Sequence, residues 1–168
     1  MVKIESNSDL KLPPEGLSLD RFDYAILRHL AGNARISMTD LARAVGLSKT
    51  PVLARVRRLE KLGVITGYRT MISAKKLDLA HVAFVEVRMT DTREPALQAF
   101  NAAIAGIPEI EECHMIAGGF DYLLKVRTRD ISDYRKIMGE QISSLPHVAS
   151  TSTYVAMDTI KETGPQAI

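Results

Sequence analysis

Apolar residues recur at helical spacing in three short segments between residues 18 and 62, which predicts three amphipathic helices. The first begins within 18–20, where Ser and Asp supply N-cap chemistry, and it ends at Gly32-Asn33. The second begins at Ser37 and ends at Gly46, because glycine tolerates the left-handed backbone of a helix C-terminus. The buried stripes of these two helices are predicted to contain Phe22, Ile26, Leu27, Leu30, Leu41, Ala42 and Val45.

The third predicted helix covers residues 49–62 and has two chemically different faces. Ser48 is placed at its N-cap, and Pro51 lies in the first turn, where a missing backbone N–H costs nothing. One stripe is apolar, and the opposite face holds small residues and cations. The apolar stripe consists of Val52, Val56, Leu59 and Leu62, and the opposite face of Thr50, Ala54, Arg57, Arg58 and Lys61.

Two helices joined by a four-residue turn that contains glycine have the spacing of a helix-turn-helix, here of a winged-helix-like kind. The following residues, 64–80, are short of helical periodicity and rich in β-branched residues, which predicts a strand and a linker. The domain boundaries predicted on this basis are an arm over 1–17, the helix-turn-helix domain over 18–66, the strand and linker over 67–80, a second domain over 81–160 and a tail over 161–168.

The second domain alternates strand and helix patterns in the order β-α-β-β-α-β, which is the order of a ferredoxin-like α+β sandwich. Strands are predicted over 81–89, 109–117, 122–128 and 148–157. Two helices on one face leave the other face of the sheet bare, and an apolar bare face favours a second copy as its partner. The residues predicted on the bare face are Phe84, Ile116, Leu123 and Tyr154.

Basic residues are concentrated before residue 77. Residues 1–76 hold 14 Lys and Arg against seven Asp and Glu, whereas 77–168 hold eight against 13, so the two parts carry +7 and −5. Charge alone does not separate a polyanion-binding domain from a solvated basic face. Together with the helix-turn-helix spacing, however, the nine basic residues against one acid within 41–76 favour nucleic-acid binding over a plain helical bundle.

Several classes of protein are disfavoured by what the chain lacks. Its single cysteine, Cys113, excludes an intrachain disulfide framework and fits a reducing compartment. No apolar run approaches the roughly 18 residues of a membrane span, and the first 16 residues show no apolar signal segment. We therefore expect a cytoplasmic protein without a membrane partner.

Enzyme chemistry is also not indicated. Cys113 and His114 are neighbours in a predicted strand and point to opposite faces, so they cannot pair as nucleophile and base. The histidines have no metal-ligand spacing, and no phosphate-binding glycine loop is present. We expect no enzyme activity, metal or cofactor. The alternatives are an effector-binding oligomeric module without DNA binding and a small-molecule enzyme built on the ferredoxin-like domain.

The chain resembles the Lrp/AsnC (leucine-responsive, feast/famine) family of bacterial transcription regulators over about residues 19–162. Its leucine-responsive and proline-utilisation branches are the most similar in appearance. Lys49, where many members carry proline, and Val52, often cysteine, depart from the pattern. The resemblance rests on LDRFD at 19–23 with Ile26-Leu27, on ISMTDLARAVGLSKTPVLARVRRLEKLGVITGY at 36–68 and on GGFDYLLKVRTRDISDYRKIMGEQISSLPHVASTSTYVAM at 118–157.

The resemblance implies a homodimer that assembles further, often to an octamer, binds double-stranded DNA and responds to an amino-acid effector. Leucine or proline would be the first effectors to test, and amino-acid metabolism the controlled process. The helix over 49–62 would enter the major groove with its N-terminal end towards the bases. The residues placed for DNA contact are Ser48, Lys49, Thr50, Pro51, Ala54, Arg55, Arg57, Arg58 and Lys61.

The segment 118–121 is the candidate effector element. Its glycines allow close approach and left-handed turns, and Asp121 could accept an effector ammonium group. A β-hairpin turn whose Asp bonds its own loop explains the same residues without a ligand, and ordinary strand packing explains those of the last strand. The predicted effector residues are Gly118, Gly119, Phe120, Asp121, Thr151, Thr153, Tyr154 and Val155.

Overall fold

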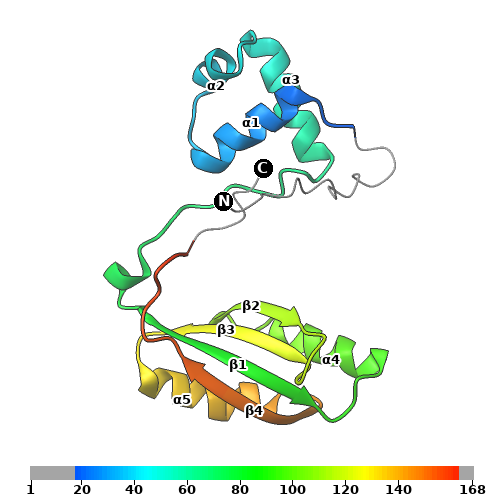
Figure 1. The fold of residues 1–168 in the computed structure, drawn as a ribbon, viewed down its shortest axis with the longest axis vertical. Coiled ribbons are helices and arrows are strands. Elements are labelled where there is room, and N and C mark those ends of the chain that lie inside the picture. Colours follow the sequence, from blue (N-terminus) through cyan, green and yellow to red (C-terminus); the bar gives the residue numbers. More distant parts are fainter. Residues whose placement is uncertain (1–17, 163–168) are drawn as a thin grey trace, which may run out of the picture. The chain divides into compact units, whose positions relative to one another are not determined.

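The computed structural model describes residues 18–162 and divides them into two compact units, with the division between Thr70 and Met71 (Figure 1). The predicted arm over 1–17 and the part of the predicted tail over 163–168 lie outside the described residues. The first unit contains three helices and the second a four-stranded sheet with two helices, as the periodicities predict. Their bounds are α1 (Arg21–Gly32), α2 (Met38–Val45), α3 (Lys49–Lys61), β1 (His81–Met89), α4 (Glu94–Ile104), β2 (Ile110–Met115), β3 (Tyr122–Thr128), α5 (Ile131–Glu140) and β4 (Val148–Val155).

The helix ends of the first unit follow the predicted capping chemistry, with one exception. The Asp20 carboxylate accepts from the N–H groups of Phe22 and Asp23, and Ser37 accepts from the Asp40 N–H. Ser48 occupies the N-cap of α3, but its side chain makes no capping hydrogen bond. The predicted N-cap position of Ser48 is therefore confirmed, but its hydroxyl does not satisfy a backbone N–H of the first turn.

A single apolar cluster holds the three helices together. Most of each predicted stripe lies in this cluster, but Phe22 is only half-buried and is not part of it. Leu62, which follows the end of α3 at Lys61, is 46% exposed. The predictions that Phe22 and Leu62 belong to the buried stripes are therefore wrong. The fully buried part of the cluster consists of Ile26, Leu27, Leu30, Leu41, Ala42, Val52, Val56 and Leu59.

The segment over 64–80 is completely described, and none of its residues lies in a strand. The strand predicted there is therefore not formed within the single chain. The only regular structure in the segment is a 3-10 helix, Ala74–Leu77. Met71 and Ile72, which the strand pattern would place against a neighbour, are 79% and 67% exposed.

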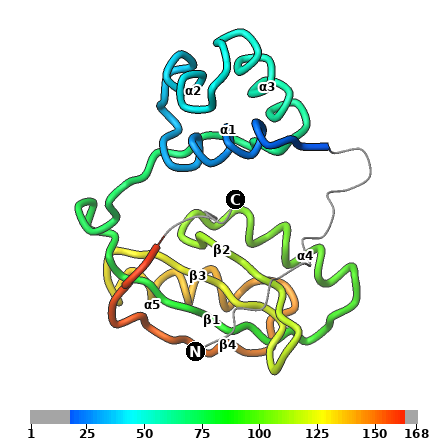
Figure 2. Tube along the Cα trace, turned by 45° about the horizontal axis from the view of Figure 1, so that its top comes forward, coloured from blue at the N-terminus to red at the C-terminus, as the bar shows by residue number. Residues whose placement is uncertain are grey.

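The sheet of the second unit has the strand order β2-β3-β1-β4, with every neighbouring pair antiparallel. Figures 1 and 2 show α4 and α5 on the same face of this sheet. Their apolar stripes pack on alternate residues of the two central strands, so the core is a single layer between helices and sheet. The strand residues of this core are Ala83, Val85, Val87, Tyr122, Leu124 and Val126.

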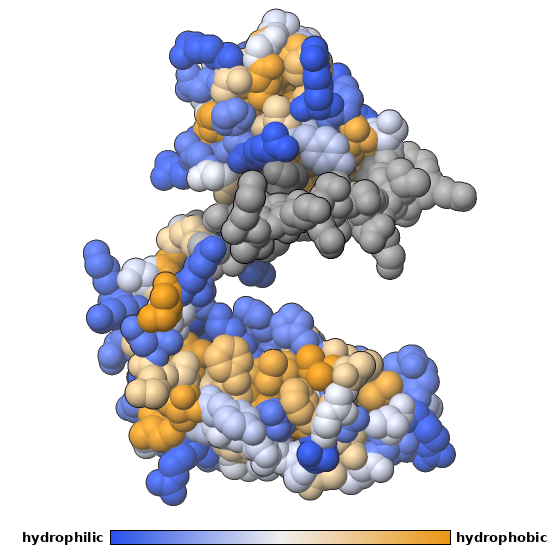
Figure 3. Space-filling model, viewed as in Figure 1, coloured by the Kyte–Doolittle hydropathy of each residue, from blue (hydrophilic) through white to orange (hydrophobic). Residues whose placement is uncertain are grey.

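The other face of the sheet carries Phe84, which pairs with Tyr154 of β4 and with Lys125 of β3. Phe84 is 38% exposed and Tyr154 55% exposed. Leu123 also faces this side, because it pairs with Glu86, but Ile116 does not belong to the sheet. Ile116 follows the end of β2 and lies half-buried in the loop to β3. Figure 3 shows apolar side chains gathered on the viewed face of this unit.

Gly46 tests whether the turn between α2 and α3 requires glycine because of its backbone conformation or because a side chain would not fit. Its φ is +72°, and a Cβ added there would meet nothing within 4 Å. We expect Gly46→Ala to lower the free energy of unfolding by about 1 kcal/mol, because an L side chain is strained in this region. Gly32→Ala, also in open space but without a positive φ, is the control and should be neutral. Urea unfolding measures both, and equal effects would contradict the interpretation.

Candidate nucleic-acid interface and effector region

Helix α3 is fixed by three fully or almost fully buried side chains, Val52, Val56 and Leu59. Because these residues lie on one stripe, the opposite side of the helix is held towards solvent. The predicted DNA-contacting residues on that side are exposed, and they begin at the N-cap. They are Ser48, Lys49, Thr50, Pro51, Ala54, Arg57 and Lys61.

Three cations on this exposed side are available for an external anion. Lys49, Arg57 and Lys61 have no ion-pair or hydrogen-bond partner for their side chains among residues 18–162. A helix surface that offers unpaired cations together with small residues such as Thr50 and Ala54 can approach a phosphate backbone closely. The exposed side of α3 is therefore suited to a nucleic acid.

Arg55 and Arg58, by contrast, are bound within the chain. Arg55 Nη1 lies 2.8 Å from Asp23 Oδ1 and 2.7 Å from Asp20 Oδ2. Arg58 Nη1 lies 3.1 Å from Asp23 Oδ2, and its other terminal nitrogen donates to the Ser18 carbonyl. Asp23 has no exposed side-chain surface. Hydrogen bonds to Asp23, followed by those to Asp20, raise the pKa of Arg55.

The loop over 118–121 is tied to the first strand of the sheet by Asp121. The Asp121 N–H donates to the Val87 carbonyl, and its Oδ2 accepts from the Met89 N–H at 2.7 Å. The Asp121 carbonyl in turn accepts from the Ile116 N–H. Asp121 thus has a role in the loop itself, while the structure gives its Oδ1 no hydrogen-bond donor among the described residues.

The two glycines of this loop are not required by the fold of the single chain. Neither Gly118 nor Gly119 has a positive φ, so the expected left-handed turn is absent. A Cβ at Gly119 would meet nothing within 4 Å, and one at Gly118 would make an ordinary contact of 3.4 Å with Ile116. Both glycines are exposed, so nothing among residues 18–162 accounts for glycine at these two positions.

The predicted effector residues of β4 lie on both faces of the sheet. Thr151 pairs with Val87, the residue that also accepts from the Asp121 N–H, so Thr151 and the loop are close to the same point of β1. Thr153 pairs with Val85, and its hydroxyl bonds the Tyr134 hydroxyl of α5. Tyr154 and Val155 are half-exposed, and Tyr154 faces away from the helices. The structure therefore places the loop and Thr151 on either side of β1 at Val87, and it does not bring the whole predicted set together.

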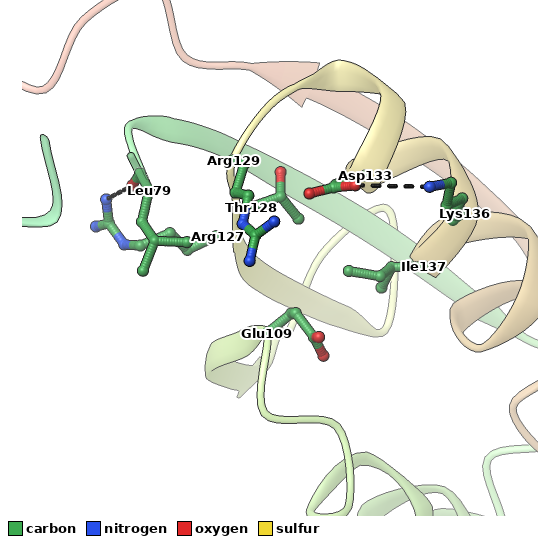
Figure 4. A pocket seen from close by; sticks show the side chains of 8 residues that line it. All are labelled: Leu79, Glu109, Arg127, Thr128, Arg129, Asp133, Lys136 and Ile137. Atoms are coloured by element: carbon green, nitrogen blue, oxygen red, sulfur yellow. Dashed lines mark hydrogen bonds and ion pairs between the residues drawn. The ribbon is translucent and has the colours of Figure 1, made fainter. Parts of the chain in front are cut away.

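A hollow of about 390 Å³ lies at the opposite end of β3 from this loop (Figure 4). It contains none of the predicted effector residues. Glu109, whose Oε2 is buried without a hydrogen-bond partner among the described residues, lies on its wall. The lining consists of Leu79, Glu109, Arg127, Thr128, Arg129, Asp133, Lys136 and Ile137.

Comparison with known families accounts for both units. Residues 19–66 match the winged helix-turn-helix DNA-binding model, and residues 82–166 match the Lrp/AsnC ligand binding domain. The chain is 63% identical over 144 residues to a proline dehydrogenase transcriptional activator of Rhodobacter capsulatus, covering 86% of this chain and 94% of that protein. The chain belongs to the Lrp/AsnC family. The family is one of transcriptional regulators, so this protein is a DNA-binding regulator and not an enzyme.

Other relatives of this Lrp/AsnC regulator support the assignment. The leucine-responsive regulatory protein of Haemophilus influenzae is 46% identical over 146 residues, covering 87% of this chain and 88% of the relative. An AsnC family regulator from Agrobacterium tumefaciens matches with a TM-score of 0.82 at 31% identity, covering 88% of this chain and 95% of that chain. A Neisseria meningitidis regulator solved as a complex with L-Met matches with a TM-score of 0.81 at 28% identity, covering 87% and 94%.

No helix between residues 18 and 162 is both long and apolar enough to cross a membrane. Within the same range, no three His, Cys, Asp or Glu side chains are grouped as a metal site would require.

The sequence interpretation of this Lrp/AsnC regulator missed the partner of Arg55 and Arg58. A signal was present, because Asp23 precedes Ile26, Leu27 and Leu30 by three, four and seven residues. A helical residue at that spacing lies on the apolar stripe itself. A carboxylate on a buried stripe needs a cation, since an unpaired buried charge is costly. The nearest arginines in the folded unit are the two that were interpreted as DNA contacts.

Proposed function

We propose that this regulator binds a roughly palindromic duplex site with α3 of each subunit in the major groove, and that an amino acid controls this binding. The exposed side of α3 with its unpaired cations is the observation that carries the proposal. The curated relatives named for proline dehydrogenase activation and for leucine response make genes of amino-acid metabolism the proposed targets. Because its proposed binding site is on chromosomal DNA, we place the protein in the cytoplasm.

The residues of α3 divide into two groups by the contacts they can make. Lys49, Arg57 and Lys61 are long cations suited to phosphates, which supply most of the affinity and no sequence information. Ser48, Thr50 and Ala54 are short enough to bring the helix close to base edges, which supply discrimination. The Ser48 hydroxyl is available for this role because it is not used to cap the helix. Pro51 lies between these positions and limits the shape of the first turn.

Arg57 provides the first test. Arg57→Ala should weaken binding to duplexes of all sequences and reduce the slope of log K against log salt by about one unit, because one phosphate contact is lost. Fluorescence anisotropy on a mixed-sequence duplex between about 50 and 200 mM salt measures the slope. Arg135→Ala, an exposed arginine of α5, is the control of equal charge and should leave the slope unchanged. An unchanged slope for Arg57→Ala would mean that Arg57 does not contact the backbone.

Homodimerisation through the bare face of the sheet is the second part of the proposal. Phe84 and Tyr154 are adjacent on that face and both partly exposed, and β4 is an edge strand whose exposed backbone can accept a neighbour. The segment after α3 adds support, because its strand-like sequence pairs with no strand among the described residues and leaves Met71 and Ile72 exposed. In a symmetric dimer, a second copy covers the bare face of the sheet and also pairs with the segment after α3. Dimers then associate further, and we propose an octamer as the final assembly.

The dimer proposal predicts that a charge placed on the bare face of the sheet prevents dimerisation. Tyr154→Glu should convert the protein to a monomer at micromolar concentration, because the change buries a charge in an apolar contact. Ile131→Glu, at a 52% exposed apolar position on α5, is the control and should leave the assembly intact. Light scattering measures both masses. A monomeric wild-type protein would contradict the proposal, as would a Tyr154→Glu protein that retains the wild-type mass.

The loop over 118–121 is the proposed effector site, together with Thr151. Its support is that the single chain requires glycine at neither position, whereas an approaching ligand or subunit would. Exposed backbone N–H groups suit an amino acid's carboxylate, and the unused Asp121 oxygen suits its ammonium group. Thr153, Tyr154 and Val155 then act through the strand and the interface rather than by direct contact. Phe120, which is half-buried, is included in the proposed site as a residue of the loop. A ligand at a subunit contact changes assembly only if it binds one state more tightly.

The effector proposal is tested by sedimentation in the presence of leucine, proline and the other amino acids in turn. We expect at least one to change the assembly size of the wild-type protein, and Asp121→Asn to abolish that change. The amide oxygen of Asn can still accept from the Met89 N–H, so the loop should be preserved while the charge is lost. Asp133→Asn, on the wall of the hollow at the other end of β3, is the control. Loss of the response in Asp133→Asn alone would place the effector in that hollow instead.

A further inference from the structure

One carboxylate in the helix-turn-helix unit is completely enclosed. Asp23 has no exposed side-chain surface, and it is one of the buried residues of α1 together with Ile26, Leu27 and Leu30. Its two oxygens accept from separate arginines, and Oδ2 also accepts from the Asp20 N–H at 3.0 Å. A buried carboxylate with this many donors fixes the groups that surround it.

The arginines that bind Asp23 belong to α3, 32 and 35 residues further along the chain. They lie three residues apart, so that both project from the same side of the helix towards α1. Asp20 completes the arrangement, since one of its oxygens caps α1 and the other binds Arg55. Donation from the Asp23 N–H is the main reason that the pKa of Asp20 is lowered. The start of α1 and the middle of α3 are therefore joined by a network of four charged side chains.

Arg57 differs from Arg55 and Arg58 in having no partner within the described residues. It is exposed and has no partner among residues 18–162, whereas the side chains of Arg55 and Arg58 are 27% and 43% exposed and ion-paired. An arginine committed to an internal carboxylate would lose that pairing on turning to a phosphate. The enclosed Asp23 would then be left with an unpaired charge, which is costly.

We propose that Asp23 is the positioning residue of the DNA-binding helix, and that Arg55 and Arg58 orient α3 rather than contact DNA. The inference rests on the DNA-binding surface proposed above and restricts its phosphate contacts on α3 to Lys49, Arg57 and Lys61. The network sets the rotation of α3 about its own axis, because two attachment points three residues apart on one side prevent the helix from rolling. The base-facing residues Thr50 and Ala54 depend on that rotation for their register in the groove.

The proposal predicts that Asp23→Asn weakens DNA binding, whereas the change in net charge alone would strengthen it. Asp23→Asn makes the protein more positive and releases two guanidinium groups, which on electrostatic grounds strengthens binding to any DNA. A positioning role predicts weaker binding to a selected site instead, by roughly ten- to hundredfold, the loss expected when one base contact is misplaced. The thermal midpoint of the domain should also fall by roughly 10 °C, since one partner of a buried ion pair has been removed.

The matched control is Asp40→Asn, which changes the net charge equally in the same unit. Asp40 is 57% exposed and pairs only with Arg43 and with Ser37 of its own helix terminus. The probe is the tightest-binding duplex recovered from a selection of genomic fragments, used well below the thermal midpoint of every variant and with folding checked by circular dichroism. Asp40→Asn should bind as tightly as the wild-type protein or slightly more so. Asp23→Asn binding that equals or exceeds wild-type binding would overturn the positioning role.

A second comparison separates positioning from phosphate contact even if Asp23→Asn does not fold. Arg55→Gln and Arg57→Gln remove the same charge from the same helix, and their salt dependence is measured on a mixed-sequence duplex. We expect Arg57→Gln to reduce the salt slope by about one unit, and Arg55→Gln to leave the slope unchanged while lowering the thermal midpoint. An equal reduction of the slope by both variants would overturn this inference alone. A slope that Arg57→Gln does not change would instead refute the proposed DNA-binding surface.

Discussion

The helix-turn-helix unit depends on how α3 is held, because the same short helix must bury one side and present another. Three apolar side chains, Val52, Val56 and Leu59, determine which side is inside, but apolar contacts are non-directional and permit small rotations. The paired charges of Asp23 with Arg55 and Arg58 are directional, and they add the rotational constraint that packing alone lacks. As a consequence, the guanidinium groups of Arg55 and Arg58 are not available to the surface of α3 that we propose binds DNA. What remains on the exposed side is a smaller set of charges with a fixed orientation.

The sheet of the second unit also has one buried face and one exposed face, and its exposed face is partly apolar. Alternate residues of β1 and β3 form the core under α4 and α5, and the residues between them form a second, partly apolar surface around Phe84. This surface is not uniformly apolar, since Lys125 and Arg127 of β3 lie beside it and are paired with Glu111 and Glu162. Charges neutralised in this way can border an interface without a large desolvation penalty, which makes a defined partner, rather than general aggregation, the natural occupant.

Much of this architecture follows from periodicity. Among residues 18–162, apolar spacing predicts the five α-helices and the four strands of the sheet, and Gly46 marks the turn of the helix-turn-helix, because the backbone there needs a positive φ. Sequence reasoning failed where a residue's role depends on a distant part of the chain. The pairing of Asp23 with Arg55 is an example, and the strand predicted within 64–80 is another, since a strand forms only when a second strand accepts its hydrogen bonds. Composition could show that α3 is basic, but not which of its arginines are already paired.

The proposed effector loop over 118–121 shows why a single subunit does not explain how a regulator of this kind responds to a ligand. Asp121 satisfies part of its hydrogen-bonding capacity within the loop, and the glycines beside it have no structural reason in one chain. An effector bound at such a loop contacts few groups of its own subunit, so its preference for one assembly must come from groups that a neighbouring subunit adds. The free energy that couples ligand to assembly is then limited by those added contacts. For the same reason the signal need not pass through α3 at all. If association fixes the spacing of paired DNA-binding helices, a change of assembly alters DNA binding while each helix keeps the orientation that Asp23 gives it.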